Sequence, residues 1–131
     1  IEFVEKVFDG QVMIKMQDEK GKINHSEIKI GDSVVMIAEA SEEWKPTQTF
    51  LHLYVENIDE TYQKALEAGA VSIKKPKDEF YGDRMASVKD SFGNFWGIAT
   101  HIEDVSEEEI QKRIGAQGFS TEEIEKSAGA N

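Results

Sequence analysis

The 131-residue chain contains no cysteine. Disulfide bonds, a thiolate nucleophile and a cysteine-bound zinc ion are therefore excluded, and the absence is typical of a reducing compartment. No apolar run approaches the roughly 18 residues of a membrane-spanning helix. No basic segment precedes an apolar stretch, as it would in a secretory signal. These absences predict a cytoplasmic protein that does not insert into a membrane.

Positive charge is also scarce. The chain has 15 Lys+Arg against 26 Asp+Glu, a formal net charge of −11. Proteins that bind nucleic acid through its phosphates need a positive patch, and the longest lysine block here is Lys74-Lys75. We therefore expect no nucleic-acid partner. With 39% hydrophobic residues, the chain is long enough to bury a core of its own.

The first third of the chain predicts a helix followed by three strands. Apolar residues between Ile1 and Phe8 recur at helical spacing, and alternation begins after Gly10. A turn at residues 18–21 and a second at Gly31-Asp32 separate the strands. The expected strands are 11–17, 23–30 and 33–38, the last being apolar enough for burial on both faces. The polar segment 39–49 reads as a linker.

The second third repeats the pattern with one more strand at its start. A strand over 50–55 leads to a helix that Asn57 caps, with Glu60 as the capping-box partner, and Gly69 ends the helix. Its apolar face carries Ile58, Tyr62, Ala65 and Leu66. Further strands are expected over 70–74, 84–89 and 95–101, with a charged and aromatic loop at 75–83 and a turn at 90–94.

These two stretches form an internal repeat of strand, helix and three strands, abbreviated βαβββ. The first copy lacks its opening strand, so that the sequence begins within the predicted helix. Beyond residue 102, Ser106 and Ser120 each precede a glutamate by three residues, which predicts two short acidic helices that pack against an edge or a partner. The fold class is therefore α+β.

The repeat and its motifs are similar to a known family. The segments GDSVVMIAE (31–39), FLHLYVENIDETYQKALEAGA (50–70), FYGDRM (80–85) and KDSFGNFWGIATHIEDVS (89–106) resemble the glyoxalase/bleomycin-resistance/dioxygenase superfamily, also called the vicinal oxygen chelate fold. Its PhnB-like subgroup is the most similar. The resemblance implies a cupped, open half-barrel sheet made by two βαβββ modules, a small-molecule ligand and a homodimer. The implied domain spans 1–102, with module one at 1–38, a linker at 39–49, module two at 50–102 and an acidic helical tail at 103–131.

Catalytic members of that superfamily hold a divalent metal with histidine, glutamine or glutamate at four positions. The first position falls in the missing strand, and the other three fall on Met36, Phe50 and Gly97. A thioether is a soft, weak ligand, and phenylalanine and glycine offer none. We therefore expect neither a metal nor another cofactor.

The candidate binding residues extend these positions along the strands and the 75–83 loop. His52 and Tyr54 alternate with Phe50 and share its face. Phe80 and Tyr81 could cover a ligand, with Arg84 as the counter-ion to a carboxylate or phosphate. The alternatives are a structural histidine and a surface pair between Arg84 and Asp83 or Asp90. The predicted ligand-binding set is Met36, Phe50, His52, Tyr54, Phe80, Tyr81, Arg84 and Gly97.

Three functions remain open from the sequence. The first is a protein that binds a small, flat molecule without a metal. The second is a lyase, isomerase or dioxygenase that uses displaced ligands from His25, His52 and Glu27, or a metal-free acid–base catalyst that uses His52 and Tyr54. The third is an interaction protein that binds a partner through its acidic tail.

Overall fold

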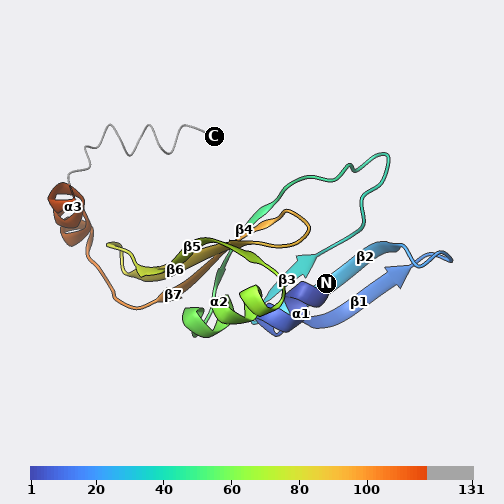
Figure 1. Ribbon diagram of the computed structural model, residues 1–131, viewed down its shortest axis with the longest axis horizontal. Coiled ribbons are helices and arrows are strands. Elements are labelled where there is room, and N and C mark those ends of the chain that lie inside the picture. The colour runs from blue at the N-terminus through green and yellow to red at the C-terminus, as the bar shows by residue number, and fades with distance from the viewer. Residues whose placement is uncertain (118–131) are drawn as a thin grey trace.

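The computed structural model describes residues 1–117 and contains two β-sheets with helices on one side (Figure 1). In chain order the elements are α1 (Glu2–Phe8), β1 (Gln11–Gln17), β2 (Ile23–Ile30), β3 (Ser33–Met36), β4 (Phe50–Tyr54), α2 (Ile58–Glu67), β5 (Val71–Asp78), β6 (Asp83–Lys89), β7 (Phe95–His101) and α3 (Glu107–Ala116). This order confirms the α+β class and the internal repeat.

The two sheets have related topologies. The first has the order β1-β2-β3, with antiparallel pairs, and the second has the order β4-β7-β6-β5. In the second sheet β4 runs parallel to β7, whereas the other pairs are antiparallel. The second sheet and α2 thus form one complete unit of a strand, a helix and three strands. Within residues 1–117 the first unit has no counterpart of β4, and β3 is therefore an edge strand.

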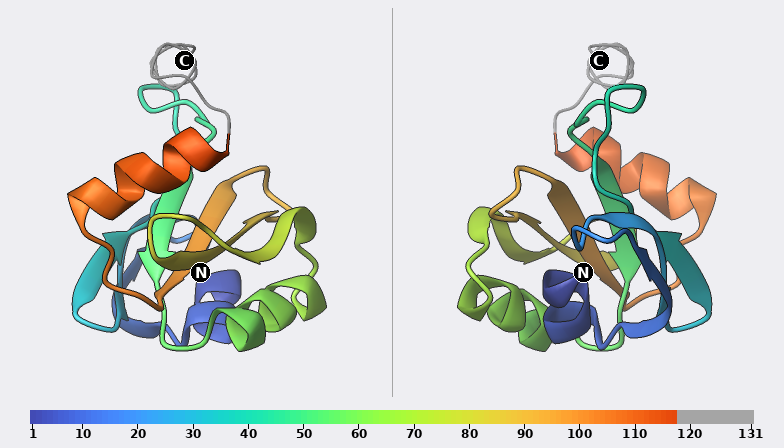
Figure 2. Two further views of the ribbon diagram at one scale, coloured as in Figure 1. Left: turned by 90° about the vertical axis from the view of Figure 1, so that its left-hand side faces the viewer. Right: turned by 90° about the vertical axis from the view of Figure 1, so that its right-hand side faces the viewer.

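Helices α1 and α2 lie beneath the sheets, and the two sheets extend from them end to end (Figures 1 and 2). The opposite side carries no helix except α3, which lies past the β5–β6 turn. The long 37–49 connection rises on that side as well. We call the side of the second sheet that faces away from α1 and α2 its open face. In the described part of the chain the strands close no barrel.

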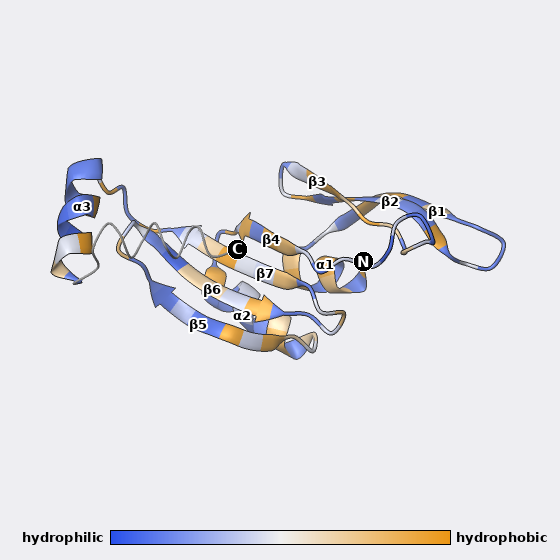
Figure 3. Cartoon of the chain, turned by 90° about the horizontal axis from the view of Figure 1, so that it is seen from above, coloured by the Kyte–Doolittle hydropathy of each residue, from blue (hydrophilic) through white to orange (hydrophobic). Residues whose placement is uncertain are grey.

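One core joins the two units. Val4, Val7 and Phe8 of α1 pack with Ile28 of the first sheet. The same cluster continues into the second sheet through residues from α2 and the sheet's helix side, namely Ile58, Ala65, Ala70, Ala86, Val88, Trp96 and Ile98. The strands in Figure 3 show the corresponding alternation of apolar and polar residues. The two units are thereby held together through their helices.

Local sequence signals explain where the helices begin. The Asn57 side chain accepts a hydrogen bond from the Glu60 backbone N–H at 3.2 Å, which caps α2. Ser106 caps α3 by accepting from the Glu109 N–H at 3.2 Å. Both caps were predicted, because a short polar side chain three residues before a glutamate satisfies a free N–H of the first turn. The second tail helix, at Ser120, lies outside the described residues.

Two sequence expectations are wrong. Segment 33–38 is not a strand covered on both faces: β3 ends at Met36, and Val34 and Met36 are 53% and 69% exposed. Strand β5 does not end at residue 74 but continues to Asp78 through Pro76. Proline cannot donate to a sheet ladder, but β5 is an edge strand, and the pairing with β6 is irregular between Lys74 and Lys77, where Pro76 lies.

The chain passes itself closely at Gly82, between the β5–β6 turn and the end of β7. Its carbonyl accepts from the N–H groups of Ile102 and Glu103 at 2.9 and 3.0 Å. Gly82 has φ +102°, and a side chain there would collide with the Glu103 carbonyl. Gly69 has a similar φ of +95° but open space around it.

Replacing Gly82 with alanine should therefore cost more than replacing Gly69. For Gly69→Ala we expect a loss of about 1–2 kcal/mol, the cost of a left-handed backbone. For Gly82→Ala we expect roughly 1–3 kcal/mol more, because backbone must move. Urea unfolding of both variants measures the difference. Equal losses would show that the close approach does not constrain the fold.

Candidate functional site

Strand β4 presents three aromatic side chains on the open face. Phe50, His52 and Tyr54 alternate with Leu51 and Leu53, which pack against the core on the other side. Phe50 and Tyr54 are 63% and 62% exposed. The His52 and Tyr54 rings meet edge to face with centroids 5.3 Å apart. The structure thus brings three of the predicted residues together on one face of β4.

Pairing across the strands extends this aromatic line into a surface. Residues opposite one another in neighbouring strands share a face of the sheet. Three rows therefore cross the open face from β4 to β5. They are Phe50–Phe95–Lys89–Val71, His52–Gly97–Ser87–Lys74 and Tyr54–Ala99–Met85–Lys77.

Small residues on β7 let the aromatic rings lie low on the sheet. A methyl group added at Gly97 would approach His52 Nδ1 to 2.7 Å and Phe50 Cζ to 3.1 Å, so these two rings lie over the glycine. Ala99, the next residue on this face, is fully buried. The candidate site is consequently a flat aromatic surface rather than a deep cavity.

A polar cluster borders this surface at the end of β4. The Tyr54 hydroxyl donates to Asp83 Oδ2 at 2.6 Å, and His101 Nδ1 lies 2.9 Å from Asp83 Oδ1. His101 Nε2 lies 2.7 Å from Asp104 Oδ1. Asp83 is only 6% exposed, and these contacts occupy both of its carboxylate oxygens. The cluster fixes the Tyr54 ring in place.

The contacts also set the charges of the cluster. Burial by itself would raise the pKa of Asp83, but hydrogen bonds from Tyr54 and His101 hold that pKa below its usual value. Hydrogen bonds to Asp104 and Asp83 raise the pKa of His101. The hydrogen bond to Asp83 raises the pKa of Tyr54, which keeps the phenol protonated. These shifts favour the charged forms of Asp83 and His101 and the neutral form of Tyr54.

The remaining predicted residues lie elsewhere. Arg84 belongs to the helix side, where its guanidinium pairs with Asp59 and Asp78 at 2.9 and 2.8 Å. The prediction of a surface pair for Arg84 is right in kind, but the predicted partners, Asp83 and Asp90, are wrong. Met36 lies on β3 in the other sheet. The structure does not bring either residue to the aromatic surface.

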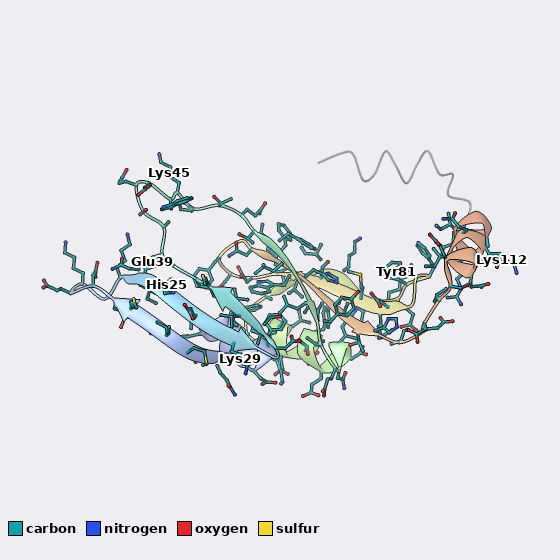
Figure 4. All side chains as sticks on the ribbon, turned by 180° about the vertical axis from the view of Figure 1, so that it is seen from behind. His25, Lys29, Glu39, Lys45, Tyr81 and Lys112 are labelled. Atoms are coloured by element: carbon teal, nitrogen blue, oxygen red, sulfur yellow. The ribbon has the colours of Figure 1, made fainter. Side chains whose placement is uncertain are left out.

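The two aromatic residues of the β5–β6 turn contact each other edge to face, with centroids 5.2 Å apart, but their other neighbours differ. Tyr81 donates its hydroxyl to Met85 Sδ at 2.6 Å, and Met85 belongs to the third row of the open face. Phe80 lines a cavity of about 420 Å³ beside α3, together with Ile102 and Arg113. Only Tyr81 therefore borders the open face. In Figure 4, Tyr81 lies on the same side of the molecule as Lys112 of α3, whereas His25 lies on the other side, in the first sheet.

The positions of the three histidines test whether displaced ligands could form a metal site. His25 Nε2 lies 3.0 Å from Glu27 Oε1 on the first sheet, whereas His52 and His101 belong to the second. Within residues 1–117 no three His, Asp or Glu side chains gather in a way that could hold a metal ion. Over the same residues, no helix is long and apolar enough to span a membrane.

Sequence reasoning missed Lys74, Lys77 and Lys89 as neighbours of the aromatic residues. Lys74 and Lys77 lie between two of the family motifs and Lys89 lies at the edge of another, and only the strand register places the three lysines in rows. It also missed the role of Asp83 and His101. The signal for this pair was the expected pairing of strands 84–89 and 95–101, which brings the two residues opposite each other.

The charged pair predicts a pH dependence of stability. The lowered pKa of Asp83 gives stability that is lost as pH falls through that pKa, below about 4. The raised pKa of His101 gives stability that is complete below about pH 6.5 and is lost as pH rises through the raised value. The melting temperatures of wild type and His101→Gln should therefore differ more at pH 5.5 than at pH 9. An equal difference at both pH values would contradict the pairing.

Comparison with known proteins places this geometry in a family. Residues 1–98 match the model of the Glyoxalase/Bleomycin resistance protein/Dioxygenase superfamily. An uncharacterized protein of Mycobacterium bovis is 30% identical over 129 residues, which cover 90% of this chain and 85% of that protein.

Solved structures share the fold. TioX from Micromonospora sp. ML1 superposes with a TM-score of 0.65 at 23% identity, over 77% of this chain and 86% of TioX. TnmS3 from Streptomyces sp. CB03234, described as an antibiotic binding protein, has a TM-score of 0.60 at 16% identity, over 76% of this chain and 82% of TnmS3. The chain belongs to the glyoxalase/bleomycin resistance protein/dioxygenase superfamily.

Proposed function

We propose that this protein binds a small, flat molecule on the open face of its second sheet. The observation that carries the proposal is the line of Phe50, His52 and Tyr54, whose rings lie side by side and remain exposed to solvent. Aromatic side chains gain stability from burial and from stacking on other rings. A flat ligand laid across them would bury the surface that the protein leaves open.

Two further points support binding. Exposed apolar surface that is contiguous and bordered by polar groups is typical of a site of interaction. The border here is the Asp83 and His101 pair. TnmS3, which shares the fold, is described as an antibiotic binding protein, and a related use of the sheet in this chain is consistent with that description.

The cluster at Tyr54 favours binding over metal-free acid–base catalysis. A general base must accept a proton at its working pH. The Tyr54 hydroxyl donates a hydrogen bond to Asp83, which raises the pKa of the phenol. Tyr54 therefore serves better as a fixed, neutral ring than as a proton acceptor.

The first sheet supports a homodimer, which we propose works in the cytoplasm. Ile14, Met16, Val34 and Met36 all lie on one face of that sheet by strand register, and they are 38% to 69% exposed. A second copy that covers this face would bury them and could add Met36 to the wall of the binding surface.

Substitution of Phe50 tests the binding surface. Nile red is a neutral, planar dye that brightens in apolar surroundings. Losing one stacked ring should cost about 0.5–1.5 kcal/mol of binding free energy. Phe50→Ala should therefore bind the dye with a roughly 2- to 10-fold weaker affinity than wild type. Phe50→Leu should fall between Phe50→Ala and wild type, since it keeps apolar area but not the ring.

Phe92 provides the matched control. It is 82% exposed, lies in the β6–β7 turn and belongs to none of the three rows. Phe92→Ala should bind the dye as wild type does. If Phe92→Ala weakened dye binding as much as Phe50→Ala, or if wild type bound no dye, the open face would not be the site.

A charge on the first sheet tests the dimer. Light scattering after size exclusion should give twice the chain mass for wild type at about 100 μM, and the single-chain mass for Val34→Lys/Met36→Lys. Burying two unpaired lysines in an apolar contact is strongly unfavourable. Ile102→Lys, at a 48% exposed site outside this sheet, should remain dimeric. A monomeric wild type would refute the proposal.

A further inference from the structure

Each of the three rows on the open face contains one lysine. Lys89 lies on β6, and Lys74 and Lys77 lie on β5, so that the lysines form a border opposite the aromatic side chains of β4. Strands are about 4.8 Å apart, which places β6 roughly 10 Å and β5 roughly 14 Å from β4. A lysine side chain on β6 is long enough to reach most of the way back to β4, and a lysine side chain on β5 reaches toward β7.

Within the described part of the chain, these lysines have no acidic partner. Over residues 1–117, no carboxylate oxygen lies within 4.0 Å of the Nζ atom of Lys74, Lys77 or Lys89, whereas Lys64 on α2 pairs with both Asp9 and Glu60. Unpaired lysines on one face are unexpected in a chain with a net charge of −11, in which acidic side chains are the more numerous.

Two neighbouring carboxylates already have partners. Asp78 pairs with Arg84 on the helix side of the sheet. Asp83 accepts from Tyr54 and pairs with His101. Neither of these two forms an ion pair with the lysines of the β5 and β6 border.

One lysine also connects the charged border with the aromatic surface. The Nζ atom of Lys89 lies 5.3 Å from the centre of the Phe95 ring. Phe95 is paired with Phe50 across the strands. A ligand ring stacked on Phe50 would therefore have the positive charge of Lys89 on its β6 side, with the Phe95 ring between the ligand and the charge.

We propose that the ligand of the open face is a flat aromatic anion, with its rings over Phe50, His52 and Tyr54 and its carboxylate-type group toward Lys89 and Lys74. This inference rests on the proposed binding function and adds the chemical class of the ligand. The anion supplies the partner that the lysines lack, and charge-assisted hydrogen bonds to a carboxylate are stronger than neutral ones.

Three naphthalene probes of equal ring size test the charge. They are 2-naphthoate, the neutral 2-naphthamide and the cationic 2-naphthylmethylammonium, each titrated calorimetrically into the full chain at pH 7.5 and low salt. We expect the naphthoate to bind at least about 5-fold more tightly than the amide, and the ammonium to bind most weakly. The net charge of −11 by itself would favour the opposite order.

Charge-removing variants locate the effect. Lys74→Gln/Lys89→Gln should lose the preference for naphthoate over naphthamide while it binds naphthamide as before. The control Lys6→Gln/Lys20→Gln removes two exposed lysines from α1 and the β1–β2 turn. This control changes the net charge by the same amount as Lys74→Gln/Lys89→Gln does, and it should keep the preference for naphthoate over naphthamide. Loss of the preference in both double variants would show a general charge effect and overturn the inference.

The outcomes separate this inference from the binding function. If the amide or the ammonium binds as tightly as the naphthoate, the anionic class is wrong and the binding surface stands. If Nile red binds and no naphthalene does, the ligand class is also wrong. If wild type binds no Nile red, the binding surface and the ligand class both fail.

Discussion

The burial of Trp96 is the interaction on which the rest of the structure depends. Its ring packs against the Phe3 and Phe8 rings of α1, with centroids 5.6 and 5.1 Å away. Its indole N–H donates to Asp90 Oδ2 at 2.9 Å, and Asp90 also accepts from the N–H groups of Phe92 and Asn94. One side chain thus joins the helix of the first unit to the sheet and the hairpin turn of the second.

This burial also decides which residues reach the open face. Successive side chains of a strand point to opposite sides, so Trp96 on the helix side directs Phe95, Gly97 and Ala99 to the other. A register shift of one residue would exchange the two sets and bury a glycine where the core needs an indole. The small residues beneath the His52 and Phe50 rings are therefore a consequence of how the core is packed.

The sequence was sufficient for the repeat, the helix caps and the β4 face, because these follow from spacing within one segment. Asn57, Gly69 and the alternation at Phe50, His52 and Tyr54 act over a few residues. Arg84, in contrast, required knowledge of the sheet register, which turns it toward Asp59 on α2. Segment 33–38 was predicted to be buried because its composition is apolar, but β3 lies at a sheet edge, and composition does not report position in a sheet.

The three lysines of the open face could be found only from strand pairing, because each is remote in sequence from the β4 aromatic residue in its row. The account that results is of a sheet with one face packed by helices and one face kept for a ligand.

The most direct test of this account is the set of intermolecular nuclear Overhauser effects between 2-naphthoate and the protein. The account predicts contacts from the naphthalene protons to the side chains of Phe50, His52 and Tyr54. Contacts confined to Phe80 and Ile102, in the cavity beside α3, would contradict it.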